Sequence, residues 1–247
     1  MTLPVYVHDG TASLRAGDDV VLDGDEGRHA VTVRRTAAGE RVVLTDGAGA
    51  AATVLVTDAA KASLTGVVEE AEVRPAEEPR VTVVQAIPKG ERADLAVEVL
   101  TEVGVDEIVP WAAERCVAVW KGEEKTAKAL AKWRATAREA AKQARRVWFP
   151  TVAEPATTDD VAALLAGASV PVVLDEAASG PIGNLPIPGR GSIVVVVGPE
   201  GGISPAELEA FAAVGAEPVR LGSSVLRTST AGVAAVAALL ARTRRWG

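Results

Sequence analysis

The first part of the chain alternates short apolar runs with turn residues. Runs rich in Val and Leu within residues 1–72 are separated by turns that contain Gly and Asp. Asp46-Gly47 stands between two such runs and predicts a β-hairpin, because glycine accepts the positive φ of a tight turn. Residues 25–35 are less strand-like and predict one helix. The pattern is typical of a small β-barrel domain that includes a helix.

This pattern stops at residues 73–80, VRPAEEPR, where two prolines stand among charged residues with no periodicity. Such a stretch is typical of a linker. We therefore expect a first domain over residues 1–72, a linker over 73–80 and a second domain over 81–247.

In the second domain, apolar runs alternate with stretches of helical periodicity. The run SIVVVV is apolar without alternation, which suits a strand buried on both faces. Alternating strands and helices predict an α/β domain, with a mostly parallel sheet covered by helices on both faces. The expected strands are 81–86, 107–111, 170–175, 192–198 and 218–222, and the expected helices are about 92–103, 123–148, 159–167, 205–214 and 229–245.

Composition limits the classes of protein to consider. The 247 residues are 48% apolar and the net charge is −7, so wholesale disorder is excluded and overall charge does not indicate a nucleic-acid binder. Cys116 is the one cysteine and His8 and His29 are the two histidines, which argues against a disulfide, a metal site or a conventional catalytic triad. Neither a leader peptide nor an apolar stretch near the roughly 20 residues of a membrane span is present, so we expect a soluble, cytoplasmic protein.

The most informative segment is the glycine-rich loop that starts at Gly198, GPEGGISPAE, directly after the buried strand. Ligands of parallel sheets bind where strands end at their carboxyl edge, and glycines let the backbone approach a ligand closely. Ser204 as N-cap, Pro205 at the first helical position and Glu207 predict a capping box for the next helix. A tight turn that only starts this helix is the alternative interpretation.

The loop lacks the Lys-Ser/Thr pair of a phosphate-binding P-loop, and Glu200 would repel a phosphate. A ligand with an adenosine moiety, a positive centre and no phosphates suits it better, and S-adenosylmethionine fits that description. A second loop, LGSSVLRTSTA from Leu221, also follows a strand and precedes a helix. Its Val225 and Leu226 can enclose a planar base, and Arg227 can orient an acceptor nucleotide. Helix capping by Thr228 or Ser229 is the alternative.

The stretch from about 123 to 148 predicts a helix with one apolar face and one strongly basic face. Residues 121–146 contain nine Lys or Arg against three Glu, an excess of +6 in a chain of net −7. Such a concentration is what binding to a phosphate backbone requires, although a solvated helix face is the alternative. Lys89 and Arg92, after the first strand of the second domain, can also meet phosphate, and His29 and Arg34 can touch RNA. We expect Cys116 to be a small buried residue rather than a nucleophile.

These stretches together resemble the RsmE type of 16S ribosomal RNA uracil-N3 methyltransferase, within the SPOUT superfamily. The matching segments are QAIPKGER, TEVGVDEIVP, ERC, KWRATAREAAKQARRVWFPTV, VVGPEGGISPAELE and LGSSVLRTSTA, in the family's order over most of residues 81–231. The resemblance implies a PUA-like β-barrel followed by an α/β methyltransferase domain whose C-terminal part forms a deep trefoil knot. It also implies a homodimer that binds S-adenosylmethionine as cofactor and takes 16S rRNA or the small ribosomal subunit as substrate. Neither a metal nor a membrane is expected as a partner.

Two positions depart from the family pattern. Family members commonly have an Arg near the N-terminal aromatic residue, where this chain has LPVYV, and a Lys where it has Val99. The resemblance implies Leu174 to Glu176, Gly198 to Ile203 and Leu221 to Thr228 as the cofactor loops. Within them the expected cofactor-binding residues are Leu174, Glu176, Gly198, Pro199, Gly201, Gly202, Ile203, Leu221, Gly222, Val225, Leu226 and Thr228.

The implied chemistry is methyl transfer to N3 of uracil, an atom that carries a proton at neutral pH. No His or Cys is placed as a base, so we expect Arg227 to stabilise the deprotonated uracil, with Glu200 as a weaker candidate for proton handling. The alternatives are a non-catalytic RNA-binding or ribosome-assembly module and a SPOUT enzyme for another RNA. The expected RNA-binding residues are Lys89, Arg92, Lys128, Lys132, Arg138, Lys142, Arg145, Arg146, His29 and Arg34.

Overall fold

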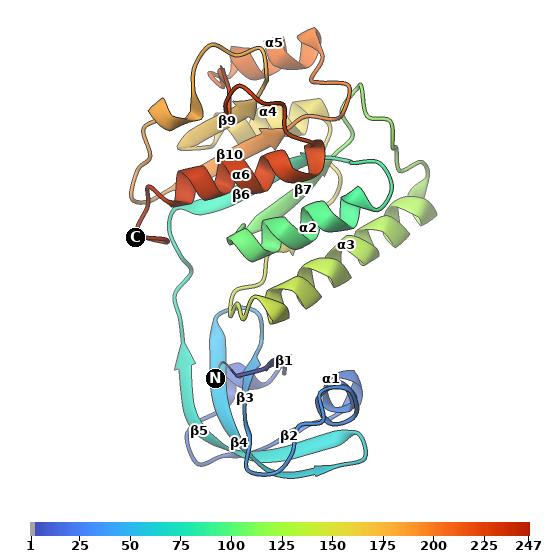
Figure 1. Cartoon of the computed structure of the whole chain (residues 1–247), viewed down its shortest axis with the longest axis vertical. Helices are drawn as coiled ribbons and strands as arrows, with labels where there is room; N and C mark the ends of the chain where they lie inside the picture. Colours follow the sequence, from blue (N-terminus) through green and yellow to red (C-terminus); the bar gives the residue numbers. More distant parts are fainter. Residues whose placement is uncertain (1–2) are drawn as a thin grey trace. The chain divides into compact units, whose positions relative to one another are not determined.

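The computed structural model describes residues 3–247, which group into two compact units (Figure 1). Unit 1 comprises the described residues up to Ala76 together with Ala141–Phe149, and unit 2 comprises Glu77–Ala140 and Pro150–Gly247. The segment Ala141–Phe149 thus groups with unit 1, although it is separated from the rest of that unit by a long stretch of sequence.

Unit 1 is built on one five-stranded sheet in the order β1-β3-β4-β5-β2. β1 pairs with β3 in parallel and the other neighbours are antiparallel. The expected hairpin is confirmed, since β3 and β4 pair in antiparallel across Asp46-Gly47 and the Asp46 carboxylate accepts the backbone N–H of Ala48 at 2.7 Å. The strands are β1 (Val5–Val7), β2 (Asp19–Leu22), β3 (Arg41–Thr45), β4 (Ala50–Ala60) and β5 (Ser63–Val73).

One helical segment interrupts these strands, as expected from residues 25–35. α1 (Gly24–Arg28) continues directly into a π-helical turn, η2 (His29–Val33), and a short 3₁₀ turn, η1 (Thr11–Ser13), precedes β2. The core of the unit follows the period of two that strands impose: Val20 and Leu22 of β2 are buried whereas Asp19 and Val21 are exposed.

Unit 2 contains a six-stranded sheet in which every neighbouring pair is parallel, in the order β11-β9-β10-β6-β7-β8. The parallel sheet expected from the apolar runs is therefore confirmed, and the SIVVVV run forms the interior strand β10. The strands are β6 (Arg80–Ala86), β7 (Glu107–Trp111), β8 (Thr151–Val152), β9 (Val170–Leu174), β10 (Ser192–Val197) and β11 (Pro218–Val219).

Helices cover both faces of this sheet because neighbouring residues of each strand point to opposite sides. Val195 and Val197 of β10 pack in one apolar core with α2, α3 and α6, and Val194 and Val196 pack in another with α4 and α5. Figure 1 shows α2 and α6 side by side on the first face. The helices are α2 (Arg92–Val103), α3 (Glu123–Gln143), α4 (Thr158–Ala166), α5 (Pro205–Ala213) and α6 (Thr228–Leu240), with a 3₁₀ turn η3 (Ile182–Asn184).

The basic helix differs from expectation at its end. It stops at Gln143 rather than near residue 148, because Arg145 adopts the left-handed conformation with φ 57°. The Arg146 N–H then bonds the Ala141 carbonyl at 2.9 Å and the Arg145 N–H bonds the Lys142 carbonyl at 3.1 Å. These two bonds are those of a Schellman motif, which ends a helix. Among the described helices, none combines the length and apolar character needed to cross a membrane.

Candidate functional site

Three loops of unit 2 gather at one edge of its sheet. β11, β9 and β10 are neighbours in the sheet, and their carboxyl ends lead into residues 221–228, 174–176 and 198–203. Because the strands are parallel, these ends lie at the same edge. The three segments expected to bind a cofactor are therefore brought to one place by the strand order.

The loop after β10 keeps its shape through glycine. Gly202 has φ 74°, a conformation that other residues adopt only with strain, and its N–H bonds the Pro199 carbonyl at 2.9 Å. A Cβ on Gly201 would lie 3.0 Å from Cβ of Arg115 and 3.2 Å from its carbonyl oxygen. The backbone at Gly201 thus approaches a second segment, which follows β7, as closely as packing allows.

The capping box expected at the start of α5 is present. Ser204 Oγ accepts the Glu207 N–H at 3.3 Å, and Glu207 Oε2 accepts the Ser204 N–H at 2.8 Å. Glu207 is only 4% exposed, and its Oε1 accepts the backbone N–H of Glu114 at 2.8 Å. One buried carboxylate therefore fixes both the start of α5 and the segment after β7.

That segment, Glu114-Arg115-Cys116, contains contacts that the sequence analysis did not assign to the site. Arg115 Nη1 donates to the Gly201 carbonyl at 3.3 Å. The signal available in the sequence was the position of two charged residues, Glu114 and Arg115, shortly after a strand of the parallel sheet. Glu200 Oε1 in turn accepts the backbone N–H of Lys89 at 3.3 Å, so Glu200 links its loop to the loop after β6.

Burial raises the pKa of the Cys116 thiol, and the nearby carboxylates Glu200 and Glu207 raise it further. The Sγ atom lies 3.7 Å from the Trp111 carbonyl oxygen. A thiol with a raised pKa stays protonated at neutral pH, where the thiolate is the nucleophile. His8 and His29 both belong to unit 1, whereas the three loops belong to unit 2.

The loop that precedes α6 exposes apolar side chains. Val225 is 71% exposed and Leu226 is 41% exposed, although both would be stabilised by burial. Arg227 immediately follows and its side chain is exposed, whereas its carbonyl accepts the N–H groups of Thr230 at 2.8 Å and Ala231 at 2.9 Å. The backbone of Arg227 is thereby held at the start of α6 while its guanidinium is open to a ligand.

Two buried polar atoms lie near the start of α6. Gln85, at 1% exposure, donates from Nε2 to the carbonyls of Ala86 at 2.9 Å and Thr228 at 3.2 Å. Its Oε1 atom and Ser229 Oγ are buried without a hydrogen-bond partner among the residues that the structure describes. Buried polar groups are normally paired with protein, water or ligand, so these two atoms are available to a bound water or ligand.

Comparison with known proteins agrees with this organisation. Residues 76–240 match the RNA methyltransferase domain family and residues 22–69 match the RNA methyltransferase PUA domain family. The ribosomal RNA small subunit methyltransferase E of Mycobacterium tuberculosis is 45% identical over 234 residues, which cover 93% of this chain and 89% of that protein. The chain belongs to the ribosomal RNA small subunit methyltransferase E family.

The same family fold is found among solved structures. Ribosomal RNA small subunit methyltransferase E from Neisseria gonorrhoeae, bound to S-adenosyl methionine, aligns with TM-score 0.86 and 29% identity and covers 98% of both chains. A putative methyltransferase from Legionella pneumophila, in complex with the cofactor SAM, aligns with TM-score 0.86 and 27% identity, covering 98% of this chain and 99% of that one. The expected resemblance, with an N-terminal PUA-like domain and an α/β methyltransferase domain, is confirmed.

The residues that the sequence analysis assigned to RNA binding are distributed over both units. In unit 2, Lys128, Lys132 and Arg138 are exposed on α3, and Lys132 pairs with Asp94 at 2.6 Å. In unit 1, Lys142 was expected on the exposed face of the helix, but that expectation is wrong. Its side chain is 3% exposed and pairs with Glu26 at 2.9 Å, because the helix end packs within unit 1.

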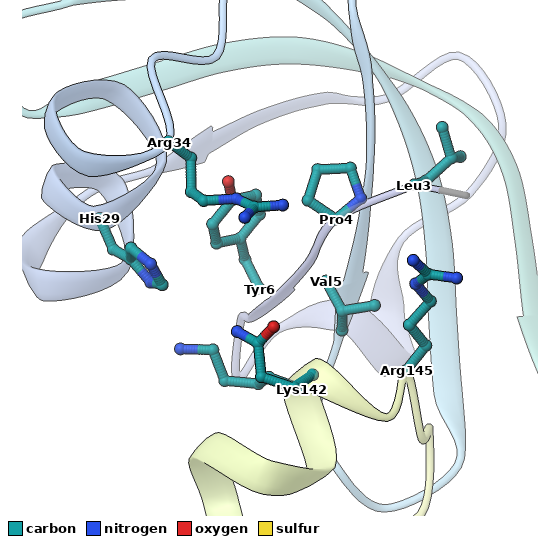
Figure 2. A pocket seen from close by; sticks show the side chains of 9 residues that line it. Leu3, Pro4, Val5, Tyr6, His29, Arg34, Lys142 and Arg145 are labelled. Atoms are coloured by element: carbon teal, nitrogen blue, oxygen red, sulfur yellow. The ribbon is translucent and has the colours of Figure 1, made fainter. Parts of the chain in front are cut away.

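Four of these predicted residues line a single pocket in unit 1. They are His29, Arg34, Lys142 and Arg145, drawn together in Figure 2. Lys89 and Arg92, by contrast, are exposed in unit 2, near the loop that Glu200 contacts.

Proposed function

We propose that this family member uses S-adenosylmethionine to methylate N3 of a uridine in 16S ribosomal RNA of the small subunit. The observation that carries the proposal is the convergence of the 174–176, 198–203 and 221–228 loops at one edge of the parallel sheet, with apolar and acidic side chains open to solvent. The relatives named above as methyltransferases with bound SAM support it.

The residues of these loops fit the cofactor in shape and in charge. The backbone at Gly202 has open space where a Cβ would stand, so a flat ring can approach it closely, and Val225 and Leu226 offer exposed apolar surface to cover that ring. Gly198 and Gly201 instead allow close packing of the loop against Ile203 and Arg115. Glu176 and Glu200 are exposed acidic side chains, which favour a ligand with positive centres over one with phosphates. Leu174, Pro199, Ile203, Leu221, Gly222 and Thr228 complete the set of residues that we propose to hold the cofactor.

When bound, S-adenosylmethionine supplies an electrophilic methyl group on a sulfonium. The task left to the protein is to present uracil N3 in line with that group and to favour loss of the N3 proton. Arg227, anchored by its own carbonyl at the start of α6, has its guanidinium free to stabilise the negative charge on the uracil once the proton leaves for solvent. Glu200 is the weaker candidate for handling that proton, since its carboxylate also accepts the Lys89 N–H.

The proposal extends to assembly and topology. We propose a homodimer, and a C-terminal trefoil knot formed by the segments that carry the proposed cofactor loops. Sedimentation of the purified protein tests the first part: a monomer at micromolar concentration would contradict it.

The decisive experiment uses labelled S-adenosylmethionine and small ribosomal subunits from a strain that lacks the modification. Incorporated methyl groups are mapped by nuclease digestion and mass spectrometry, and we expect 3-methyluridine in 16S rRNA. A methyl group on another RNA or atom would instead support the SPOUT enzyme with a different target. Cofactor binding without any transfer to the small subunit would likewise favour a SPOUT enzyme for another RNA, and no cofactor binding would favour the non-catalytic module.

Two matched variants test the role of Arg227. Arg227→Gln is expected to lower kcat about 10²–10³-fold, the effect of removing one electrostatic stabiliser, while cofactor affinity is retained. Arg220→Gln is the control, because Arg220 is also exposed and lies just before the same loop. Equal rates for the two variants would remove Arg227 from the reaction.

A further inference from the structure

The pocket of unit 1 gathers positive charge from parts of the chain that are far apart in sequence. β1 contributes Tyr6, the helical segment contributes His29 and Arg34, and the end of α3 contributes Lys142 and Arg145. Figure 2 shows Arg34 and His29 on the side of the helical segment and Arg145 on the side of α3. All lining residues belong to unit 1, so the pocket is complete within that unit.

Buried contacts hold the floor of this pocket in place. Lys142 pairs with Glu26 at 2.9 Å and is 3% exposed, so its charge is largely compensated by that carboxylate. The Tyr6 ring meets the His29 imidazole edge to face with ring centroids 5.9 Å apart, and the Tyr6 hydroxyl lies 3.3 Å from Thr36 Oγ1. The ring contact orients the His29 imidazole and leaves its N–H able to donate a hydrogen bond to a ligand.

The two exposed arginines are different. Neither the Arg34 nor the Arg145 guanidinium has an ion-pair partner in the described part of the chain, residues 3–247. Both line the same pocket, together with His29 and Lys142. An anion bound in the pocket would offset the arginine charges and accept several N–H groups at once, because a guanidinium presents its donors as a planar fork.

The backbone at both arginines is unusual. Arg34 closes the π-helical turn, with its N–H bonded to the His29 carbonyl at 3.0 Å, and such turns are frequent at functional sites. Arg145 occupies the position after α3 where the Schellman motif favours glycine, with φ 57°. The chain thus keeps an arginine at a position where glycine would be less strained, and strain of this kind points to a role for the side chain.

The size of the pocket restricts the anion. Its volume is about 50 Å³, room for roughly four water molecules at 10–15 Å³ each, which suits one phosphate group. We propose that the pocket binds one phosphodiester group of the RNA substrate through Arg34, Arg145 and His29. The proposal rests on the proposed function, since it takes the RNA of that reaction as the source of the phosphate.

Arg145→Gly in the full chain tests the proposal, with Lys61→Gly as a matched control. Lys61 is also exposed, also in unit 1 and also has a positive φ, 58°, but it does not line the pocket. Both changes remove one charge and relieve the same backbone strain, so neither should unfold the protein. Arg34→Gln serves as a second variant within the pocket.

The measurement is binding of a 16S rRNA transcript at several salt concentrations, together with S-adenosylmethionine affinity. We expect Arg145→Gly and Arg34→Gln to weaken RNA binding about tenfold or more. The slope of log K against log salt should become shallower by about 0.7–0.9 for each RNA phosphate that the variant no longer neutralises. Cofactor affinity should stay unchanged, and Lys61→Gly should change RNA affinity less than about twofold.

Equal RNA affinity for Arg145→Gly and Lys61→Gly would overturn the pocket assignment, and so would a wild-type protein that binds no RNA. Competition by a nucleoside monophosphate at micromolar concentration would assign the pocket to a free phosphate ester and overturn the RNA assignment. If the wild-type protein binds RNA through the pocket but leaves 16S rRNA unmethylated, the proposed function fails and the phosphate site stands.

Discussion

Glu207 offers the sharpest test of how the three-loop site is held together. Its carboxylate is 4% exposed and accepts two backbone N–H groups, from Ser204 at 2.8 Å and from Glu114 at 2.8 Å. Glu207→Ala leaves both N–H groups without that acceptor. A hydrogen bond to a charged group contributes about 1.5–3 kcal/mol, so for the two bonds we expect a loss of about 3–6 kcal/mol in the free energy of unfolding.

The capping box of α4 provides the matched control. There Asp160 accepts the Thr157 N–H at 2.9 Å, but Asp160 is exposed and, within residues 3–247, its carboxylate bonds only Thr157. Asp160→Ala should therefore be clearly less destabilising than Glu207→Ala. The loss of stability in Glu207→Gln should lie between those of the two alanine variants, because the amide oxygen accepts only one of the two N–H groups well.

Urea unfolding of the full chain measures these differences. Trp111, one of five tryptophans in the chain, packs against Phe211 of α5 with ring centroids 5.6 Å apart, so its part of the fluorescence signal reports on the region around Glu207. S-adenosylmethionine affinity should fall in Glu207→Ala and remain near that of the wild type in Asp160→Ala. If the two alanine variants lost equal stability, the bond to Glu114 would contribute nothing and the reasoning would be refuted.

Three other residues give predictions of their own. Because the pKa of Cys116 is raised by burial, we expect it to react with iodoacetamide at neutral pH well below the rate of a free cysteine, and Cys116→Ala to keep methyltransferase activity; rapid labelling would contradict this. The Arg245 side chain is 3% exposed and bonds Asp106 at 2.7 Å, so Arg245→Ala should lower the free energy of unfolding by about 3 kcal/mol, as measured by urea unfolding. The hydrogen bonds from Thr157 lower the pKa of Asp160, so its stabilising contribution is present above the unfolded pKa and is lost as pH falls through the folded value. In thermal melts at a series of acidic pH values, the melting temperature should therefore depend less steeply on pH in Asp160→Asn than in the wild type.

Local pattern was enough for most elements of unit 2. The run SIVVVV specifies a buried strand because every position is apolar, and β7 and α2 have the bounds expected from their periodicity. The start of α5 was also predictable, since Ser204, Pro205 and Glu207 act on backbone groups within one helical turn. The grouping of the 198–203 and 221–228 loops was expected from the rule that parallel strands end at a common edge, whereas the 174–176 segment was implied by the resemblance alone.

What the sequence by itself determined is therefore most strands and helices of unit 2, the capping box of α5 and the family. Tertiary structure alone decided that Glu207 also bonds Glu114, that Arg115 reaches Gly201, and that Lys142 is buried against Glu26 instead of facing solvent. Each of these contacts joins residues 86 or more positions apart. Helical periodicity placed Lys142 on the basic face, but burial depends on which segment packs against that face, and periodicity within one helix contains no information about its partner.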